Sequence, residues 1–163
     1  MKIIVFSLIL FLFTACQTKD NSRLKLLENK VSYLEEQLVN AYQPGFGEMM
    51  SSIQAHHSKL WFAGKNTNWK LANFEVKELY EIIEDVEKYQ KKRPETKEIK
   101  LIYPALKSIR KSVSNKDLQQ FKTDFKTLTN ACNQCHKATD FGYNLVKIPT
   151  DSPFTNQNFK VEN

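Results

Sequence analysis

Hydrophobic side chains recur every three or four residues through most of this sequence, which is the spacing of one face of an α-helix. From residue 46 onward they form four stretches: residues 46–63, residues 69–90, a shorter one that begins at Pro104, and a last one that opens at Ser114. No run of alternating β-branched residues interrupts them, and glycine (4) and proline (5) are scarce. Because no single amphipathic helix can bury its own stripe, we predict an all-α, antiparallel four-helix bundle.

A narrower apolar seam, with spacings that alternate between three and four, precedes these stretches and ends before Pro44 and Gly45. This is the heptad pattern of a coiled coil. Three heptads are barely enough for a stable zipper alone. Two partners are equally favoured: a second copy of the chain, giving a homodimer through residues 24–41, or the bundle, on which the segment would lie as a fifth helix. The seam residues are Leu24, Leu27, Val31, Leu34, Leu38 and Ala41.

The N-terminus predicts export. Lys2 is followed by IIVFSLILFLF, an apolar run that is too short to span a membrane and typical of a signal peptide. The next residues, FTAC, resemble the lipobox of bacterial lipoproteins, although Phe13 stands where such boxes usually carry Leu. The resemblance implies that residues 1–15 are removed and that Cys16 is lipidated. An ordinary export signal or an uncleaved anchor is the alternative.

We therefore expect residues 16–43 to carry the lipid anchor and the heptad helix, on the periplasmic side of a bacterial cell envelope. The formal charge is +6 at pH 7 and is spread along the chain, without the dense basic stripe of a nucleic-acid-binding protein. No pair of carboxylates, activated nucleophile or phosphate loop stands out, so we do not expect an enzyme. Only His56 or His57 would support peroxidase-like chemistry.

The sequence TNACNQCHKATD, residues 129–140, carries the most specific chemistry. Two cysteines separated by two residues and followed by histidine form the attachment motif of a c-type haem, in which the thiols add across the vinyl groups and the imidazole binds iron. We predict one covalent haem c per chain, anchored by Cys132 and Cys135, with His136 as the proximal iron ligand.

Three other interpretations use the same residues. A thioredoxin-like pair would open a helix after a strand, whereas Cys132 and Cys135 close a helix in a chain without predicted strands. A structural zinc site would need His56 or His57 as a fourth ligand and would be crowded on one helical turn. A disulfide across two residues is strained and leaves His136 unexplained.

A haem motif near the end of the last helix of a four-helix bundle resembles the cytochrome c prime group, the class II c-type cytochromes. The resemblance covers roughly residues 46–140, within a haem domain expected at residues 44–140, and its specific part is CNQCH. Residues 141–163 lie outside it as an irregular tail. In this tail we expect four apolar residues to cover the end of the core: Phe141, Tyr143, Leu145 and Ile148.

In such a bundle the end of the last helix lies beside the start of the first, so the sixth iron ligand should come from GEMMSSIQAHH. Four residues are eligible: Met49, Met50, His56 and His57. Met50 and His57 share the apolar stripe, whereas Met49 and His56 face further round, so Met50 and His57 are the two candidates, with Met50 favoured by its position in the first turns. The resemblance implies that low-spin members of the group use a Met of the first helix, whereas high-spin members block the position with an apolar side chain.

Electron transfer at the membrane surface, with redox proteins of the cell envelope as partners, is the leading function. A five-coordinate haem protein that binds nitric oxide or carbon monoxide is the first alternative. A lipoprotein without haem, in which residues 132–136 hold zinc, is the second.

Overall fold

The computed structural model describes residues 21–38 and 44–161, and these residues form helices and no strand, which confirms the all-α class. The chain divides into two compact units, Met1–Gln43 and Pro44–Asn163. In the first unit, residues 21–38 form one helix. The expected signal peptide, Cys16 and Ala41 lie outside the described residues. None of the described helices is long and apolar enough to cross a membrane.

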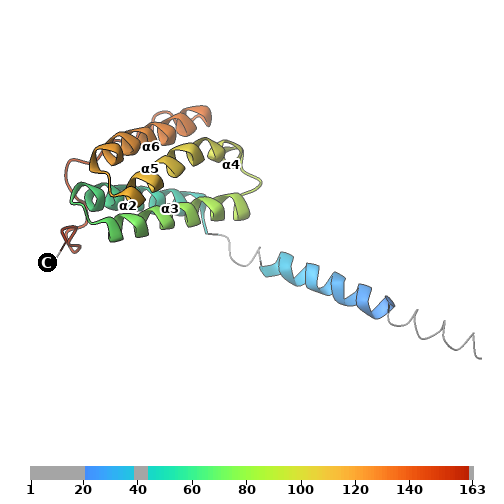
Figure 1. Ribbon diagram of the computed structural model, residues 1–163. Helices are drawn as coiled ribbons and strands as arrows, with labels where there is room; N and C mark the ends of the chain where they lie inside the picture. Colours follow the sequence, from blue (N-terminus) through green and yellow to red (C-terminus); the bar gives the residue numbers. More distant parts are fainter. Residues whose placement is uncertain (1–20, 39–43, 162–163) are drawn as a thin grey trace, which may run out of the picture. The chain divides into compact units, whose positions relative to one another are not determined.

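Residues 44–161 of the second unit, called here the helical domain, form six helical elements. Figure 1 shows their arrangement. They are α2 (Phe46–Lys65), α3 (Trp69–Tyr89), α4 (Glu95–Glu98), the 3-10 helix η1 (Ile99–Ile102), α5 (Tyr103–Asn115) and α6 (Leu118–Ala138). The predicted limits of α2 and α3 agree with the structure to within two residues. Between the second and third predicted stretches, where the apolar pattern indicated no helix, α4 and η1 form two short helical elements.

Local hydrogen bonds explain where α3 and α6 begin. The Asn68 side chain accepts a hydrogen bond from the Leu71 amide at 3.2 Å, and Asp117 accepts one from the Gln120 amide at 2.9 Å. Ser114, predicted to open the last helix, lies inside α5 instead. That helix runs further, to Asn115, and is capped by Lys116, whose φ of 57° is left-handed.

The helices of the helical domain pack in pairs, α2 against α3 and α5 against α6, with further contacts from α3 to α5 and from α6 to α2 and η1 (Figure 1). Gly64 permits the closest approach of α2 to α6, because a Cβ atom there would clash with the ring of Phe121. The Phe121 and Phe125 rings are fully buried. This contact fixes the start of α6 on α2, and the motif follows at the other end of α6.

The tail after α6 agrees with the prediction only in part. Tyr143 and Leu145 are 81% and 70% exposed and do not cover the core. The buried aromatic residue of the tail is Phe159, whose ring centroid lies 5.5 Å from that of Phe62 on α2. Turns directly after α6 leave Tyr143 and Leu145 exposed. Ile148 packs against the core, as predicted.

Candidate functional site

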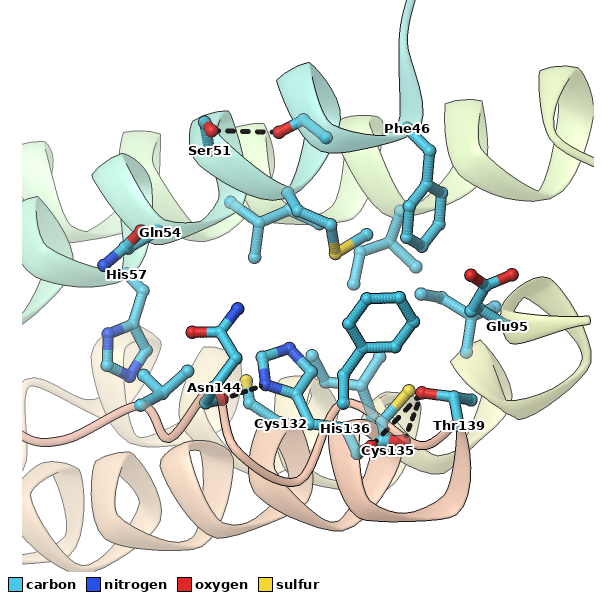
Figure 2. Close-up of a pocket in the computed structure, with 18 of the residues that line it drawn as sticks. Phe46, Ser51, Gln54, His57, Glu95, Cys132, Cys135, His136, Thr139 and Asn144 are labelled. Carbon is cyan, nitrogen blue, oxygen red and sulfur yellow. Dashed lines mark hydrogen bonds between the residues drawn. The ribbon is translucent and has the colours of Figure 1, made fainter. Parts of the chain in front are cut away.

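A cavity of about 280 Å³ separates the first half of α2 from the last turns of α6. Figure 2 shows Phe46 and His57 on the α2 side, with Cys132, Cys135 and His136 opposite them. The walls are mostly apolar, and α3, η1 and the tail complete them. The apolar lining residues are Phe46, Met50, Ile53, Ile83, Ile99, Ile102, Phe141, Leu145 and Val146.

Cys132 and Cys135 both line this cavity, and both are free thiols. Burial raises the pKa of Cys132 to about 12. Burial also raises the pKa of Cys135, with smaller contributions from the carboxylates of Glu98 and Glu95. The two sulfurs are therefore protonated at neutral pH, unlike the activated thiolate of a thioredoxin-like pair.

His136 has one ring nitrogen fixed and the other left open. Its Nδ1 lies 2.6 Å from the backbone carbonyl oxygen of Asn144. A carbonyl oxygen only accepts hydrogen bonds, so Nδ1 carries the proton and Nε2 carries the lone pair. Since the His136 ring lines the cavity, its unprotonated nitrogen is available there to a metal.

Asn133, the first residue between the two cysteines, holds the segment that supplies this carbonyl. Its side-chain amide donates to the Val146 carbonyl at 2.8 Å, and its side-chain oxygen accepts from the Val146 amide, also at 2.8 Å. This two-bond clamp ties the tail to α6 two residues beyond Asn144. It thereby positions the acceptor for His136.

His57 lies on the other side of the cavity, and its hydrogen-bonded ring nitrogen is Nε2 rather than Nδ1. The Thr129 hydroxyl donates its single proton to the Phe125 carbonyl at 2.9 Å, so His57 Nε2, 2.9 Å from the same oxygen, must donate to it. The His57 ring lies 4.5 Å from that of Phe125. Burial lowers the pKa of His57 to about 4, so the ring is neutral at pH 7.

Of the two methionines of α2 and His56, only Met50 lines the cavity. Met50 is half-buried and lines the cavity, whereas Met49 is buried in the core. His56 turns towards α3, where its Nδ1 lies 2.7 Å from a carboxylate oxygen of the buried Glu75. His56 is therefore held away from the motif, and Met50 and His57 are the candidates that the structure brings to it.

A buried carboxylate at the edge of the cavity was not anticipated from the sequence. Glu95 accepts two hydrogen bonds from the Arg93 guanidinium, the shorter at 2.6 Å, and these lower the pKa of the carboxyl. Figure 2 shows Glu95 on the side of the cavity near Phe46. The hydrogen bonds from Arg93 keep the Glu95 carboxylate ionised at this edge.

Sequence reasoning also missed Asn133, Thr129 and Asn144. Asn133 could have been suspected, because it lies inside CNQCH, whereas Asn144 acts through its backbone and leaves no side-chain signal. Among residues 21–38 and 44–161, no group of three or more His, Cys, Asp or Glu side chains is arranged to hold a metal ion. Within that part of the chain, the four-ligand zinc centre has no support.

No known protein-family model matches the chain, and neither the curated proteins nor the solved structures include a significant match.

Proposed function

We propose that the protein is a monohaem c-type cytochrome that transfers electrons at the membrane surface of the cell envelope. One observation carries the proposal: Cys132, Cys135 and His136 line the same cavity, and the Asn144 carbonyl leaves the metal-binding nitrogen of His136 free. The apolar walls suit the face of a macrocycle. The pairwise packing of α2, α3, α5 and α6 is also that expected of an antiparallel four-helix bundle.

Each residue has a defined task in this proposal. Cys132 and Cys135, present as thiols, would add across the two vinyl groups, so that each sulfur forms one C–S bond and its proton passes to the neighbouring carbon. His136 would bind iron through Nε2. The bound haem c would supply one-electron chemistry at its iron. The apolar walls would exclude water from the site, and the Asn144 carbonyl would raise the basicity of the imidazole.

Met50 is the better candidate for the sixth ligand. Its thioether lines the cavity, whereas Nε2 of His57 already donates to Thr129, and His57 could bind iron only through Nδ1. A five-coordinate haem that binds nitric oxide or carbon monoxide is the second candidate function. It is favoured by the apolar side chains Ile53 and Ile83, which line the same cavity and could fill the sixth position.

Covalent attachment is the direct test. The full chain, expressed with haem-attachment machinery, should retain haem-dependent peroxidase staining after denaturing electrophoresis. Replacing both cysteines (Cys132→Ala with Cys135→Ala) should abolish the stain, while His56→Gln, which changes a histidine outside the cavity, should preserve it. An unstained wild-type chain that carries zinc would overturn the proposal.

Visible spectra of the oxidised and reduced protein then separate the two haem functions. A low-spin ferric spectrum and slow carbon monoxide binding by the ferrous protein support the electron carrier. A high-spin ferric iron with rapid carbon monoxide binding supports the gas-binding function.

The proposed site of action is the periplasmic side of a membrane, reached through a lipid on Cys16. Wild-type protein should partition into a detergent phase, and Cys16→Ala should remain in the aqueous phase. Equal partitioning of the two proteins would show that the FTAC sequence is not used.

A further inference from the structure

The helix at residues 21–38 exposes its whole apolar seam. Leu24, Leu27, Val31, Leu34 and Leu38 are each between 53% and 71% exposed. We propose that this helix pairs with the same helix of a second chain, as a parallel and in-register two-stranded coiled coil. The proposal concerns the first unit and does not depend on haem in the second.

The charges beside the seam select the parallel orientation. In heptad positions, Leu24, Val31 and Leu38 are a residues, and Leu27 and Leu34 are d residues. The g positions before the a residues hold Arg23, Lys30 and the uncharged Gln37, and the e positions after the d residues hold Glu28 and Glu35.

Parallel helices place a g residue beside the e residue five positions later on the partner. Arg23 then meets Glu28 of the second copy, and Lys30 meets Glu35 of the second copy, with each pair repeated by symmetry. Antiparallel helices would instead set g against g and e against e. That arrangement brings Lys30 towards Arg23 and Glu28 towards Glu35, so the contacts between charged flanking residues would be repulsive.

The seam composition agrees with two strands. A β-branched residue at a with leucine at d favours a dimer over higher oligomers. Val31 meets this rule at the central a position, between Leu27 and Leu34, whereas Leu24 and Leu38 occupy the outer a positions. The polar residues at b and f, Lys25, Asn29, Ser32 and Glu36, are exposed on the opposite side of the helix.

The helical domain offers no matching surface within residues 44–161. Its exposed large apolar side chains come from α3, η1 and the chain after α6, and they form no stripe along one helix; they are Phe74, Leu101, Tyr143, Leu145 and Val161. The apolar seam runs along the whole helix at residues 21–38, so only an apolar stripe of similar length can bury it. A second copy of residues 21–38 supplies one.

Lipid anchoring would strengthen this pairing. A coiled coil of this length is marginal in dilute solution. Two chains anchored near their N-termini in one membrane would be confined at high effective concentration and would present their helices in the same direction. This step alone rests on the proposed use of Cys16, and the orientation argument stands without it.

Cysteine cross-linking of the full chain in membranes tests the pairing. Leu34→Cys places a thiol at a d position, where the two copies should approach closely enough for a disulfide, whereas Ser32→Cys places one at the outward b position. We expect the Leu34→Cys chain to form covalent dimers on mild oxidation at least several-fold faster than the Ser32→Cys chain. Equal rates, or no dimer from either chain, would overturn the proposal.

Charge exchange tests the orientation within the Leu34→Cys chain. The acidic variant (Arg23→Glu with Lys30→Glu) and the basic variant (Glu28→Lys with Glu35→Lys) should each lose dimer on the order of tenfold, because four attractive contacts become repulsive. Co-expression of the two variants, or all four exchanges in one chain, should restore it. Cross-linking that ignores these charges would contradict the parallel arrangement. Haem staining of the same samples reports independently on the proposed function.

Discussion

His136 and His57 line one cavity from opposite helices, and each has one ring nitrogen in a hydrogen bond, yet they are prepared for different tasks. His136 is partly exposed, donates from Nδ1 to a carbonyl and keeps Nε2 free. His57 is buried and donates from Nε2 to Thr129, which in turn donates to Phe125. The first arrangement presents a ligand, whereas the second anchors a neutral ring within the protein.

The difference shows how the role of a histidine near a proposed metal site can be assigned. The deciding observation is which of its two ring nitrogens is already used in a hydrogen bond. A backbone carbonyl bonded to Nδ1 fixes the tautomer and makes Nε2 a better donor to a metal. A hydroxyl bonded to Nε2 uses the nitrogen that most often binds haem iron. On this basis we propose His136 as the iron ligand and a structural role for His57.

Removal of each imidazole should give the sharpest contrast. His136→Gly should leave haem attached through the cysteines but remove its proximal ligand, so the ferric spectrum should change completely and added imidazole should restore it. His57→Gln should leave the spectrum of the wild-type protein nearly unchanged. A large spectral change in the His57 variant with none in the His136 variant would reverse the two roles.

The next prediction concerns the sixth ligand. If Met50 binds iron, Met50→Leu should abolish the weak thioether-to-iron band near the red end of the ferric spectrum and should open the ferrous iron to carbon monoxide. Met49→Leu is the matched control, because Met49 is the adjacent core residue, and it should leave the band in place. A wild-type protein that already binds carbon monoxide rapidly would assign the protein to the gas-binding alternative.

The lowered pKa of His57 predicts a pH-dependent stability. Between its ordinary pKa of 6.5 and its folded pKa of about 4, the unfolded chain binds a proton that the folded chain does not. As the pH is lowered through this window, the free energy of unfolding should therefore decrease by about 3 kcal/mol in total. The decrease should end below pH 4.

Urea denaturation of wild type and His57→Gln measures this change. Glutamine retains a donor for Thr129 and does not titrate, while the carboxylates contribute equally to both proteins. When the pH is lowered from 7 to 4.5, wild type should lose more free energy of unfolding than His57→Gln does. A difference independent of pH would show that His57 titrates normally.

Much of the fold could be predicted from the sequence, because periodic apolar residues and caps are local signals. The all-α class and the limits of α2 and α3 followed from them. Residues 141–148 were a different case, since a loop with apolar residues does not indicate which of them turn inward. Tyr143 and Leu145 are exposed, whereas Ile148 packs against the core and Phe159 is buried in it.

The candidate site was predictable to a similar degree. CNQCH identified the three residues that line the cavity from α6, and helical spacing brought Met50 and His57 to it. The partners of the two histidines were not predictable, because a backbone carbonyl at Asn144 and a threonine 72 residues from His57 are set by tertiary contacts. Burial of Met49 also depends on which neighbours surround α2.

A smaller effect is expected for the anchor of His57. Thr129→Val preserves the size of the side chain but removes the acceptor of the Nε2 proton, so a buried donor is left without its partner. The free energy of unfolding should fall by about 1–3 kcal/mol at pH 7, without a change in haem attachment. Thr127→Val, an exposed threonine on the same helix, should cost less than half as much in the same urea titration.

The smallest predicted effect concerns the support of His136. Asn133→Ala removes both hydrogen bonds to Val146 and should loosen the carbonyl that accepts from Nδ1 of His136. A less strongly hydrogen-bonded imidazole donates less charge to iron and stabilises the ferric state less, so the midpoint potential should rise. A loss of about 1 kcal/mol of differential stabilisation corresponds to about 40 mV for one electron. Gln134→Ala, at the exposed neighbouring position of the motif, should leave the potential unchanged, and equal potentials for both variants would remove Asn133 from this role.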